Sequence, residues 1–126
     1  MYEGYVTPEE YADLGYNNIP FDEIQTYLIK ASRHIDELTF NRINHYGFEK
    51  LTPFQQELIQ TVICEHADFI YDNDDIISSI FNKYSINSVS MEFGDSVNVV
   101  YISGIPIERA TYSLLKQTGL CCRLGV

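Results

Sequence analysis

The sequence predicts a mainly α-helical protein: a small helical domain of about four helices with a β-hairpin or extended loop before the last helix. Two patterns support this prediction. Apolar residues recur at spacings of three and four in two long segments, whereas apolar and polar residues alternate between residues 88 and 102. The 126 residues, 45% of them hydrophobic, suffice for one core but not for two. We therefore expect residues 1–126 to form a single domain.

The same helix-start signal occurs twice, at residues 7–10 (TPEE) and 52–55 (TPFQ). In each segment the threonine hydroxyl can cap a helix and the proline suits the first helical position. The Glu or Gln three residues after the threonine can return the hydrogen bond. These segments predict helices that begin at Pro8 and Pro53. The first should be short, because Gly15 is suited to end it.

Two longer helices are predicted from their apolar stripes. The first follows Pro20 and should end between Thr39 and Ile43. The second follows the second start signal, has the widest apolar face and should form the centre of the core. It either breaks at residues 72–75 or continues through them to about Asn82. The stripe of the first helix consists of Ile24, Leu28, Ala31, Ile35 and Leu38.

A β-hairpin is predicted between Ser88 and Ile102. Apolar and polar residues alternate on both sides of the Gly-Asp-Ser segment at residues 94–96, as they do in half-buried strands. A hairpin of two strands is only marginally stable alone. It must therefore pack on the helices or pair with a neighbouring chain.

The last helix is predicted to begin at residues 104–106 (GIP) and to end at Gly119, which fits a C-terminal cap. Residues 119–126 should then form an extended, fairly apolar C-terminal tail. The buried face of this helix is predicted to contain Ile107, Ala110 and Leu114.

The residue types that carry metal or catalytic chemistry do not occur at the required spacings. His34, His45 and His66 lack the four-residue spacing of a helical metal site, so we expect surface or capping roles for them. Cys64 has no second Cys/His pair at zinc-finger spacing. Residues 72–75 begin like a calcium loop, but the required Gly and Glu do not follow. We therefore expect a protein that is not an enzyme and binds no metal or cofactor.

The net charge of −10 argues against a surface that binds nucleic-acid phosphates. Three cysteines, two of them adjacent at Cys121 and Cys122, do not indicate a disulfide framework. The adjacent pair lacks the two-residue gap of a redox motif, so packing is its expected role. The sequence contains neither a long apolar run nor a signal-peptide pattern. We expect synthesis in a cytoplasm and no membrane partner.

Two segments resemble a known family. Residues 31–39, ASRHIDELT, resemble the A-S-x-x-I-D-x-L-T signature of the small head-tail connector (adaptor or head-completion) proteins of tailed phages and Bacillus-type prophages. Residues 118–126, TGLCCRLGV, are similar to the T-G-L-x-x-R-G-V ending of that family, except that Leu124 is inserted before the glycine. The residues that match are Ala31, Ser32, Ile35, Asp36, Leu38, Thr39, Thr118, Gly119, Leu120 and Arg123.

The resemblance implies a structural subunit that assembles as a ring beneath the portal vertex, with the portal's twelvefold symmetry. Such a ring joins the portal protein to the next connector or tail component and extends the channel, through which DNA passes without specific binding. The implied location is the virion neck. During assembly, or when the chain is encoded in a prophage, the implied location is the cytoplasm of the bacterial host.

A ring of this kind needs two different, complementary surfaces on each subunit. A hairpin edge and an apolar tail suit that need, because unpaired backbone groups and an extended segment can bind a neighbour. The residues expected to contact neighbouring copies or the portal are Val97, Val99, Tyr101, Leu120, Leu124 and Val126. The acidic residues expected to face the channel and repel DNA are Asp72, Asp74, Asp75, Glu92 and Asp95.

Alternatives remain open at this point. Arg33 and Asp36 lie three residues apart, so they can form a local ion pair or orient their helix against neighbouring chains. The chain can also be a small acidic protein-binding module, a regulator or inhibitor that acts as a monomer or dimer. A third hypothesis is a small hydrolase, which predicts paired carboxylates in a deep pocket.

Overall fold

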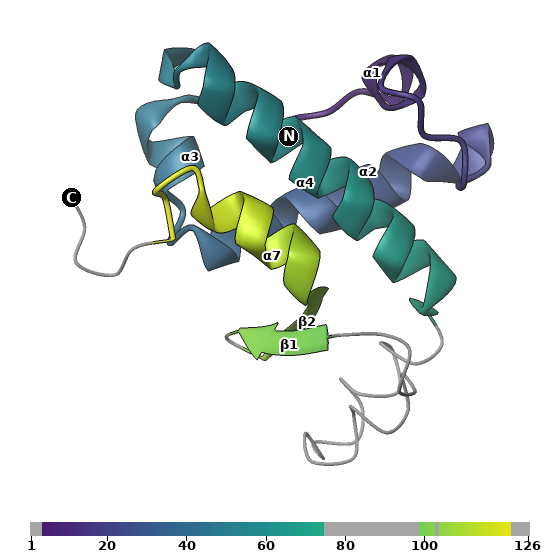
Figure 1. Ribbon diagram of the computed structural model, residues 1–126. Coiled ribbons are helices and arrows are strands. Elements are labelled where there is room, and N and C mark those ends of the chain that lie inside the picture. The colour runs from purple at the N-terminus through teal and green to yellow at the C-terminus, as the bar shows by residue number, and fades with distance from the viewer. Residues whose placement is uncertain (1–3, 75–98, 103, 122–126) are drawn as a thin grey trace.

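The computed structural model describes residues 4–74, 99–102 and 104–121. It is mainly helical, with a two-stranded antiparallel hairpin before the last helix, which confirms the predicted fold class (Figure 1). The elements in chain order are α1 (Pro8–Asp13), α2 (Phe21–Leu38), α3 (Arg42–Tyr46), the 3-10 helix η1 (Phe48–Lys50), α4 (Pro53–Asp72), β1 (Val99–Ile102), β2 (Ile105–Glu108) and α7 (Arg109–Lys116).

Both predicted helix starts are confirmed. The Thr7 hydroxyl accepts a hydrogen bond from the Glu10 amide at 3.1 Å, and the Glu10 carboxylate accepts one from the Thr7 amide at 2.9 Å. Thr52 and Gln55 make the same pair of bonds at the start of α4, at 3.1 and 3.0 Å. Each capping box satisfies two amides that helix geometry leaves without a partner. Gly15 follows α1 with φ +96°, as expected of the residue that ends this helix.

The predicted stripe of α2 is buried throughout, which confirms the amphipathic helix. The helix ends at Leu38, where the Thr39 hydroxyl donates to the carbonyl oxygen of Ile35 at 2.8 Å. Phe40 and Asn41 then adopt φ of 58° and 60°, in the left-handed region that non-glycine residues rarely occupy. This turn allows the separate helix α3 to begin only four residues after α2.

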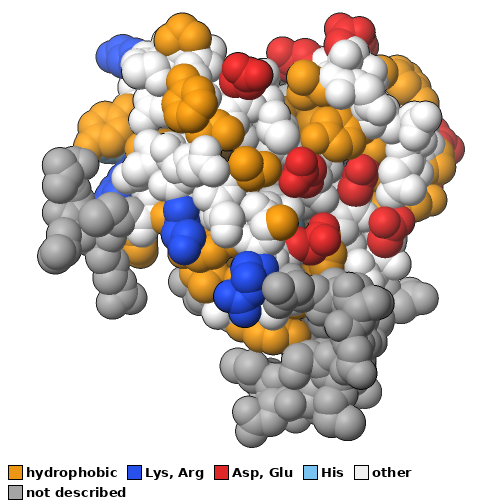
Figure 2. Space-filling view, viewed as in Figure 1, with side chains coloured by type: hydrophobic (Ala, Val, Ile, Leu, Met, Phe, Trp, Pro, Cys, Tyr) orange, Lys and Arg blue, Asp and Glu red, His pale blue; other side chains and the backbone are white. Residues whose placement is uncertain are grey.

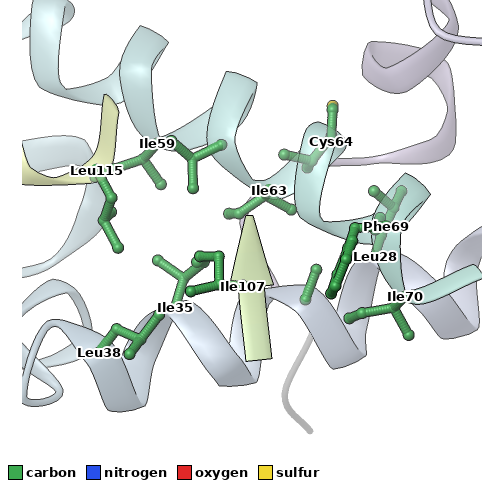
Figure 3. Packing of buried hydrophobic residues seen from close by; sticks show 14 of the residues in the cluster. Leu28, Ile35, Leu38, Ile59, Ile63, Cys64, Phe69, Ile70, Ile107 and Leu115 are labelled. Atoms are coloured by element: carbon green, nitrogen blue, oxygen red, sulfur yellow. The ribbon is translucent and has the colours of Figure 1, made fainter. Parts of the chain in front are cut away.

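The core lies where α2 crosses α4. Figure 3 shows Ile35 and Leu38 of α2 pointing toward Ile59 and Ile63 of α4, with Ile107 of β2 between the two helices. Burial of each such side chain contributes about 1.5–3 kcal/mol. Helix α4 also packs against α7, so it is buried on more than one side and forms the centre of the core as predicted.

The hairpin occupies a different position from the one predicted. Strand β1 pairs with β2 in the register Val99↔Glu108 to Ile102↔Ile105, with Gly104 at φ +82° in the turn. The predicted hairpin has its turn at residues 94–96 and its first strand before that turn, and both segments lie outside the described residues. Residues 105–108 therefore belong to a strand, and the prediction that the last helix begins at residues 104–106 is wrong.

The burial of Ile105 and Ile107 explains this correction. Ile105, Pro106 and Ile107 are all buried in β2, and Pro106 pairs with Tyr101. Among the described residues β2 has one neighbouring strand, and a strand at the edge of a sheet tolerates proline. A short buried apolar run of this kind is typical of a strand. Helix α7 begins after it, and its buried residues are Thr111 and Leu115, whereas Ala110 is exposed and Leu114 half-buried.

The C-terminal segment is fixed to the body at least as far as Leu120. The side chain of Leu120 is buried, and its carbonyl oxygen accepts a hydrogen bond from Nη1 of Arg42 at 3.0 Å. The carbonyl oxygen of Thr118 accepts another from Nε2 of Gln55 at 2.9 Å. The prediction of an extended tail that begins at residue 119 is therefore wrong for residues 119–120. Residues 122–126 lie outside the described residues.

Candidate functional site

The family-like signature in α2 points into the protein. All six of its matching residues in this segment are buried, and the signature therefore lies in the packed interior of the fold. Thr118 and Leu120 of the C-terminal match are also buried, whereas Gly119 is exposed and Arg123 lies outside the described residues. The six buried residues are Ala31, Ser32, Ile35, Asp36, Leu38 and Thr39.

Asp36 connects α2 to two other parts of the chain. Its Oδ1 accepts a hydrogen bond from the Tyr5 hydroxyl at 2.7 Å, and its Oδ2 accepts one from the side-chain amide of Asn44 at 3.2 Å. The amide of Tyr5 donates to the Ser32 hydroxyl at 3.4 Å. Two polar signature residues thus hold the N-terminal segment and α3 against α2. The sequence gives no local sign of these contacts, because the partners of Tyr5 lie about 30 residues away.

Tight packing at Gly4 accompanies this contact. Gly4 has φ +78°, and a Cβ atom added there would lie 2.8 Å from the Ser32 hydroxyl oxygen. Neither the backbone conformation nor the space accepts a larger residue. The segment before α1 therefore lies directly against α2.

A groove with a volume of about 400 Å³ lies beside these contacts, between the N-terminal segment, α3, η1 and α4. Its lining includes the carboxylates of Glu10 and Glu49. Both oxygens of Glu10 accept hydrogen bonds, from the Thr7 amide at 2.9 Å and from Nε2 of Gln60 at 3.3 Å. Glu10 is thus engaged in capping α1 and in binding Gln60.

A half-buried histidine and a buried histidine form a pair between α2 and α4. Nδ1 of His34 lies 2.9 Å from Nε2 of His66, and His66 is fully buried. Burial and the nearby charge of Lys30 lower the pKa of His34 to about 4, and burial with the charge of His34 lowers the pKa of His66 to about 3. Both rings are therefore neutral at pH 7. The expectation of a surface or capping role is wrong for His66.

The environment of His66 also selects its tautomer. Its Nδ1 is buried and has no hydrogen-bond partner among the described residues, and an N–H in that position would cost more than a lone pair. The proton therefore belongs on Nε2 of His66, which donates to Nδ1 of His34. Within the described residues, no three His, Cys, Asp or Glu side chains lie close enough together to hold a metal ion.

The described thiols are held in the protonated form. Burial, followed by the charges of Asp68, Glu10 and Glu65, raises the pKa of Cys64 to about 12. Burial raises the pKa of Cys121 to about 11, although Lys116 and Arg42 act in the opposite direction. A thiol that is not ionised at neutral pH is a poor nucleophile and a poor metal ligand. This state agrees with the packing role expected for Cys121.

A line of carboxylates follows one face of α4. Glu65, Asp68 and Asp72 lie at helical spacings of three and four, and Glu108 lies near them at the end of β2. Burial raises the pKa of Asp68 and of Glu108, and in both cases the neighbouring carboxylates raise it further, while a hydrogen bond from the Tyr11 hydroxyl acts in the opposite direction at Asp68. Of these four residues, only Asp72 was predicted as a candidate site residue. The burial of Asp68 and Glu108 depends on the fold and could not be inferred from their spacing in the sequence.

The residues predicted to contact partners or line the channel are placed only in part. Val99 and Tyr101 are half-buried in β1 and pack on the core, while Leu120 belongs to the core itself. Asp72 is exposed at the end of α4, and Asp74 is half-buried just after it. The remaining predicted residues lie outside the described part of the chain: Asp75, Glu92, Asp95, Val97, Leu124 and Val126.

Among the described residues, the largest exposed apolar side chains occur in two separate groups. Leu14 and Phe21, with exposed fractions of 45% and 74%, lie at the end of α1 and the start of α2. Phe40, Tyr46 and Phe54, with exposed fractions of 45%, 49% and 58%, lie just after α2, in α3 and at the start of α4. The composition pointed to many aromatic residues but could not tell which of them face outward.

Figure 1 places these two groups on opposite sides of the molecule. The end of α1 and the start of α2 lie on the right, and α3 and the start of α4 lie on the left. The two sides are joined by α2, whose 18 residues span about 27 Å. Exposed aromatic side chains bring large contact area at low entropy cost, so these two surfaces are the candidate functional site.

Comparison with known proteins returns no matching family model, no matching curated protein and no matching solved structure. No helix in the described part of the chain is long and apolar enough to cross a membrane.

Proposed function

We propose that this chain is a structural subunit of a head-tail connector, which forms a ring between the portal and the next connector or tail component and extends the DNA channel in the virion neck. The single observation that supports this proposal best is the pair of exposed apolar surfaces at opposite sides of the body. A subunit that contacts one neighbour on each side needs two such surfaces, and they must differ from each other.

The resemblance of the α2 segment to the connector signature gives the proposal its particular family. In this chain the signature residues are buried, and Ser32 and Asp36 bind the N-terminal segment and α3. A signature of that kind describes how a subunit folds. It leaves the surfaces that contact partners to be identified from exposure and charge.

The acidic charge suits a subunit that surrounds DNA. The chain carries a net charge of −10, and Asp72 is exposed at the end of the carboxylate line on α4. A negative lumen repels phosphates over roughly a Debye length, about 8 Å at physiological salt. We expect the assembled ring to show no retention of double-stranded DNA at low salt, and strong salt-sensitive binding would contradict this role.

The test of the function is assembly on a portal. The chain is produced together with a portal protein from the same genome, and the complex is purified on the portal and imaged by electron microscopy. We expect an added ring layer on the portal. A monomer or dimer that never binds the portal, and instead binds a basic protein, would overturn the connector function and favour the acidic protein-binding module.

Two surface variants and one control refine this test. Phe21→Ser and Phe54→Ser remove the largest exposed apolar side chain from each side of the body, and each should reduce ring formation while the chain stays folded. Ala110→Ser changes an exposed residue of α7 that belongs to neither group, and ring formation should be unchanged. Rings that form normally with both phenylalanine variants would remove the main support for the proposal.

A further inference from the structure

The side of the body that carries Leu14 and Phe21 is strongly acidic. Four exposed carboxylates lie in α1 and at the start of α2, and the sequence has no Lys or Arg before Lys30. This surface therefore combines large apolar side chains with charged groups that are all negative. We call it the acidic end surface, and it consists of Glu9, Asp13, Leu14, Phe21, Asp22 and Glu23.

The opposite side has a small excess of cations over carboxylates. Between residues 40 and 54 the sequence has two cations, Arg42 and Lys50, and one carboxylate, Glu49, a balance of +1. Between residues 4 and 24 it has five carboxylates and no cation, a balance of −5. We call the second side the cationic end surface, and it consists of Phe40, Arg42, His45, Tyr46, Lys50 and Phe54.

Arg42 is held in place on the cationic end surface. Its guanidinium lies 5.1 Å from the centre of the Phe40 ring, and its Nη1 donates to the carbonyl oxygen of Leu120. A cation fixed over an exposed aromatic ring is a frequent component of protein interfaces. On the face seen in Figure 2, blue side chains lie at the left and in the lower middle, and red side chains lie toward the top, middle and right.

From this polarity we propose that the partner of each end surface is the other end surface of a second copy of the chain, so that copies join head to tail. The proposal rests on the function proposed above and names the contact that would build the ring. Contact between two acidic end surfaces would bring like charges together and is unfavourable, which excludes the two-fold dimer made through this surface. Contact between unlike ends pairs opposite charges and covers the exposed aromatic rings on both sides. Repetition of that contact closes a ring when the rotations between successive copies add up to a full turn, a closure that assembly on a symmetric portal would impose.

Charge reversal tests the contact. One variant, Asp13→Lys/Asp22→Lys, reverses the carboxylates beside Leu14 and Phe21, and the other, His45→Glu/Lys50→Glu, reverses the opposite end. All four positions are exposed, and Arg42 is left intact because it also holds Leu120. Ring formation is measured on the portal, and self-association of the isolated chain is measured by sedimentation at low and high salt.

We expect each variant alone to form rings at least about tenfold less well than the unaltered chain. An equal mixture of the two variants, and a single chain that carries all four changes, should recover most of this loss, since unlike ends then face each other again. Added salt should weaken the association of the unaltered chain. The control is Lys30→Glu, which reverses an exposed cation in the middle of α2 and should change ring formation less than about twofold.

Other outcomes separate the two proposals. If rings form on the portal and neither reversed variant weakens them, or if the mixture stays as weak as each variant alone, the head-to-tail contact is wrong and the connector function stands. A symmetric dimer joined through the acidic end surface also overturns the contact. If the unaltered chain forms no ring on the portal, both proposals fall together.

Discussion

Large apolar side chains are buried in the interior between α2 and α4, but they are exposed at the two end surfaces. Ile35 and Ile63 are fully buried in the interior, whereas Phe21 and Phe54 are more than half exposed at the ends. The segment that resembles a known family lies in the interior, and no such pattern marks the ends. The difference teaches that a short signature can indicate how a chain folds while the surfaces of assembly are recognised only from exposure and charge.

The largest expected effect lies in the interior. Ile63→Ala removes a side chain that is 0% exposed and packed between α2 and α4, so we expect the free energy of unfolding to fall by about 2–5 kcal/mol, through lost burial and the cavity that remains. Urea denaturation followed by circular dichroism measures it. Phe54→Ala on the same helix is the control and should change stability by less than about 0.5 kcal/mol. Equal losses of unfolding free energy at the two sites would contradict the distinction between the interior and the end surfaces.

The buried histidine pair should make the stability of the interior depend on pH. The pKa is about 4 for His34 and about 3 for His66 in the folded chain, against about 6.5 when unfolded, so the unfolded chain binds more protons below pH 6.5. The free energy of unfolding therefore falls as pH falls from 6.5 toward 4. We expect this pair to contribute at least about 1.4 kcal/mol of that loss, the equivalent of one pKa unit.

The double variant His34→Gln/His66→Leu separates this effect from that of the carboxylates. It removes the buried imidazoles, so its stability should vary less with pH between 6.5 and 4 than that of the unaltered chain. His45→Gln changes an exposed histidine outside this pair and is measured beside the double variant as a matched substitution. Denaturation curves at several pH values measure both. The same slope in the double variant and the unaltered chain would contradict the assignment.

A smaller effect is expected where the N-terminal segment joins α2. Tyr5→Phe removes the hydroxyl that lies 2.7 Å from Asp36 and 2.7 Å from Asn44, and should lower the free energy of unfolding by about 1 kcal/mol. Tyr46→Phe removes a hydroxyl from a side chain that is 49% exposed, and provides the matched control. The two variants are compared by thermal and urea unfolding. A negligible effect of Tyr5→Phe would mean that the contact does not hold this segment.

The smallest effect on stability is expected at the ends. Phe21→Ser replaces a side chain that is 74% exposed, so the free energy of unfolding should change by less than about 0.5 kcal/mol. Sedimentation of the same sample should nevertheless show weaker self-association, because the variant removes apolar contact area from the acidic end surface. A large loss of stability with unchanged association would show that Phe21 serves the fold and not the contact.

The features that the sequence determined by itself are local. The two capping boxes join residues three positions apart, and the stripe of α2 follows from the helical period. Such contacts form within one or two turns, so they depend on neighbouring residues alone. The helix starts at Pro8 and Pro53 and the mainly α-helical class were therefore predicted correctly.

The tertiary structure decided the features that join distant residues. It brings His34 to His66, Tyr5 to Asp36, and Arg42 to Leu120, and no spacing in the sequence specifies these pairs. The same holds for the hairpin, because residues 105–108 become a strand when Ile105 and Ile107 are buried in the core. The separation of acidic and cationic ends also arises from the arrangement of α1, α3 and α4 around α2. Packing and long-range charge depend on where the whole chain lies in space, which local patterns do not contain.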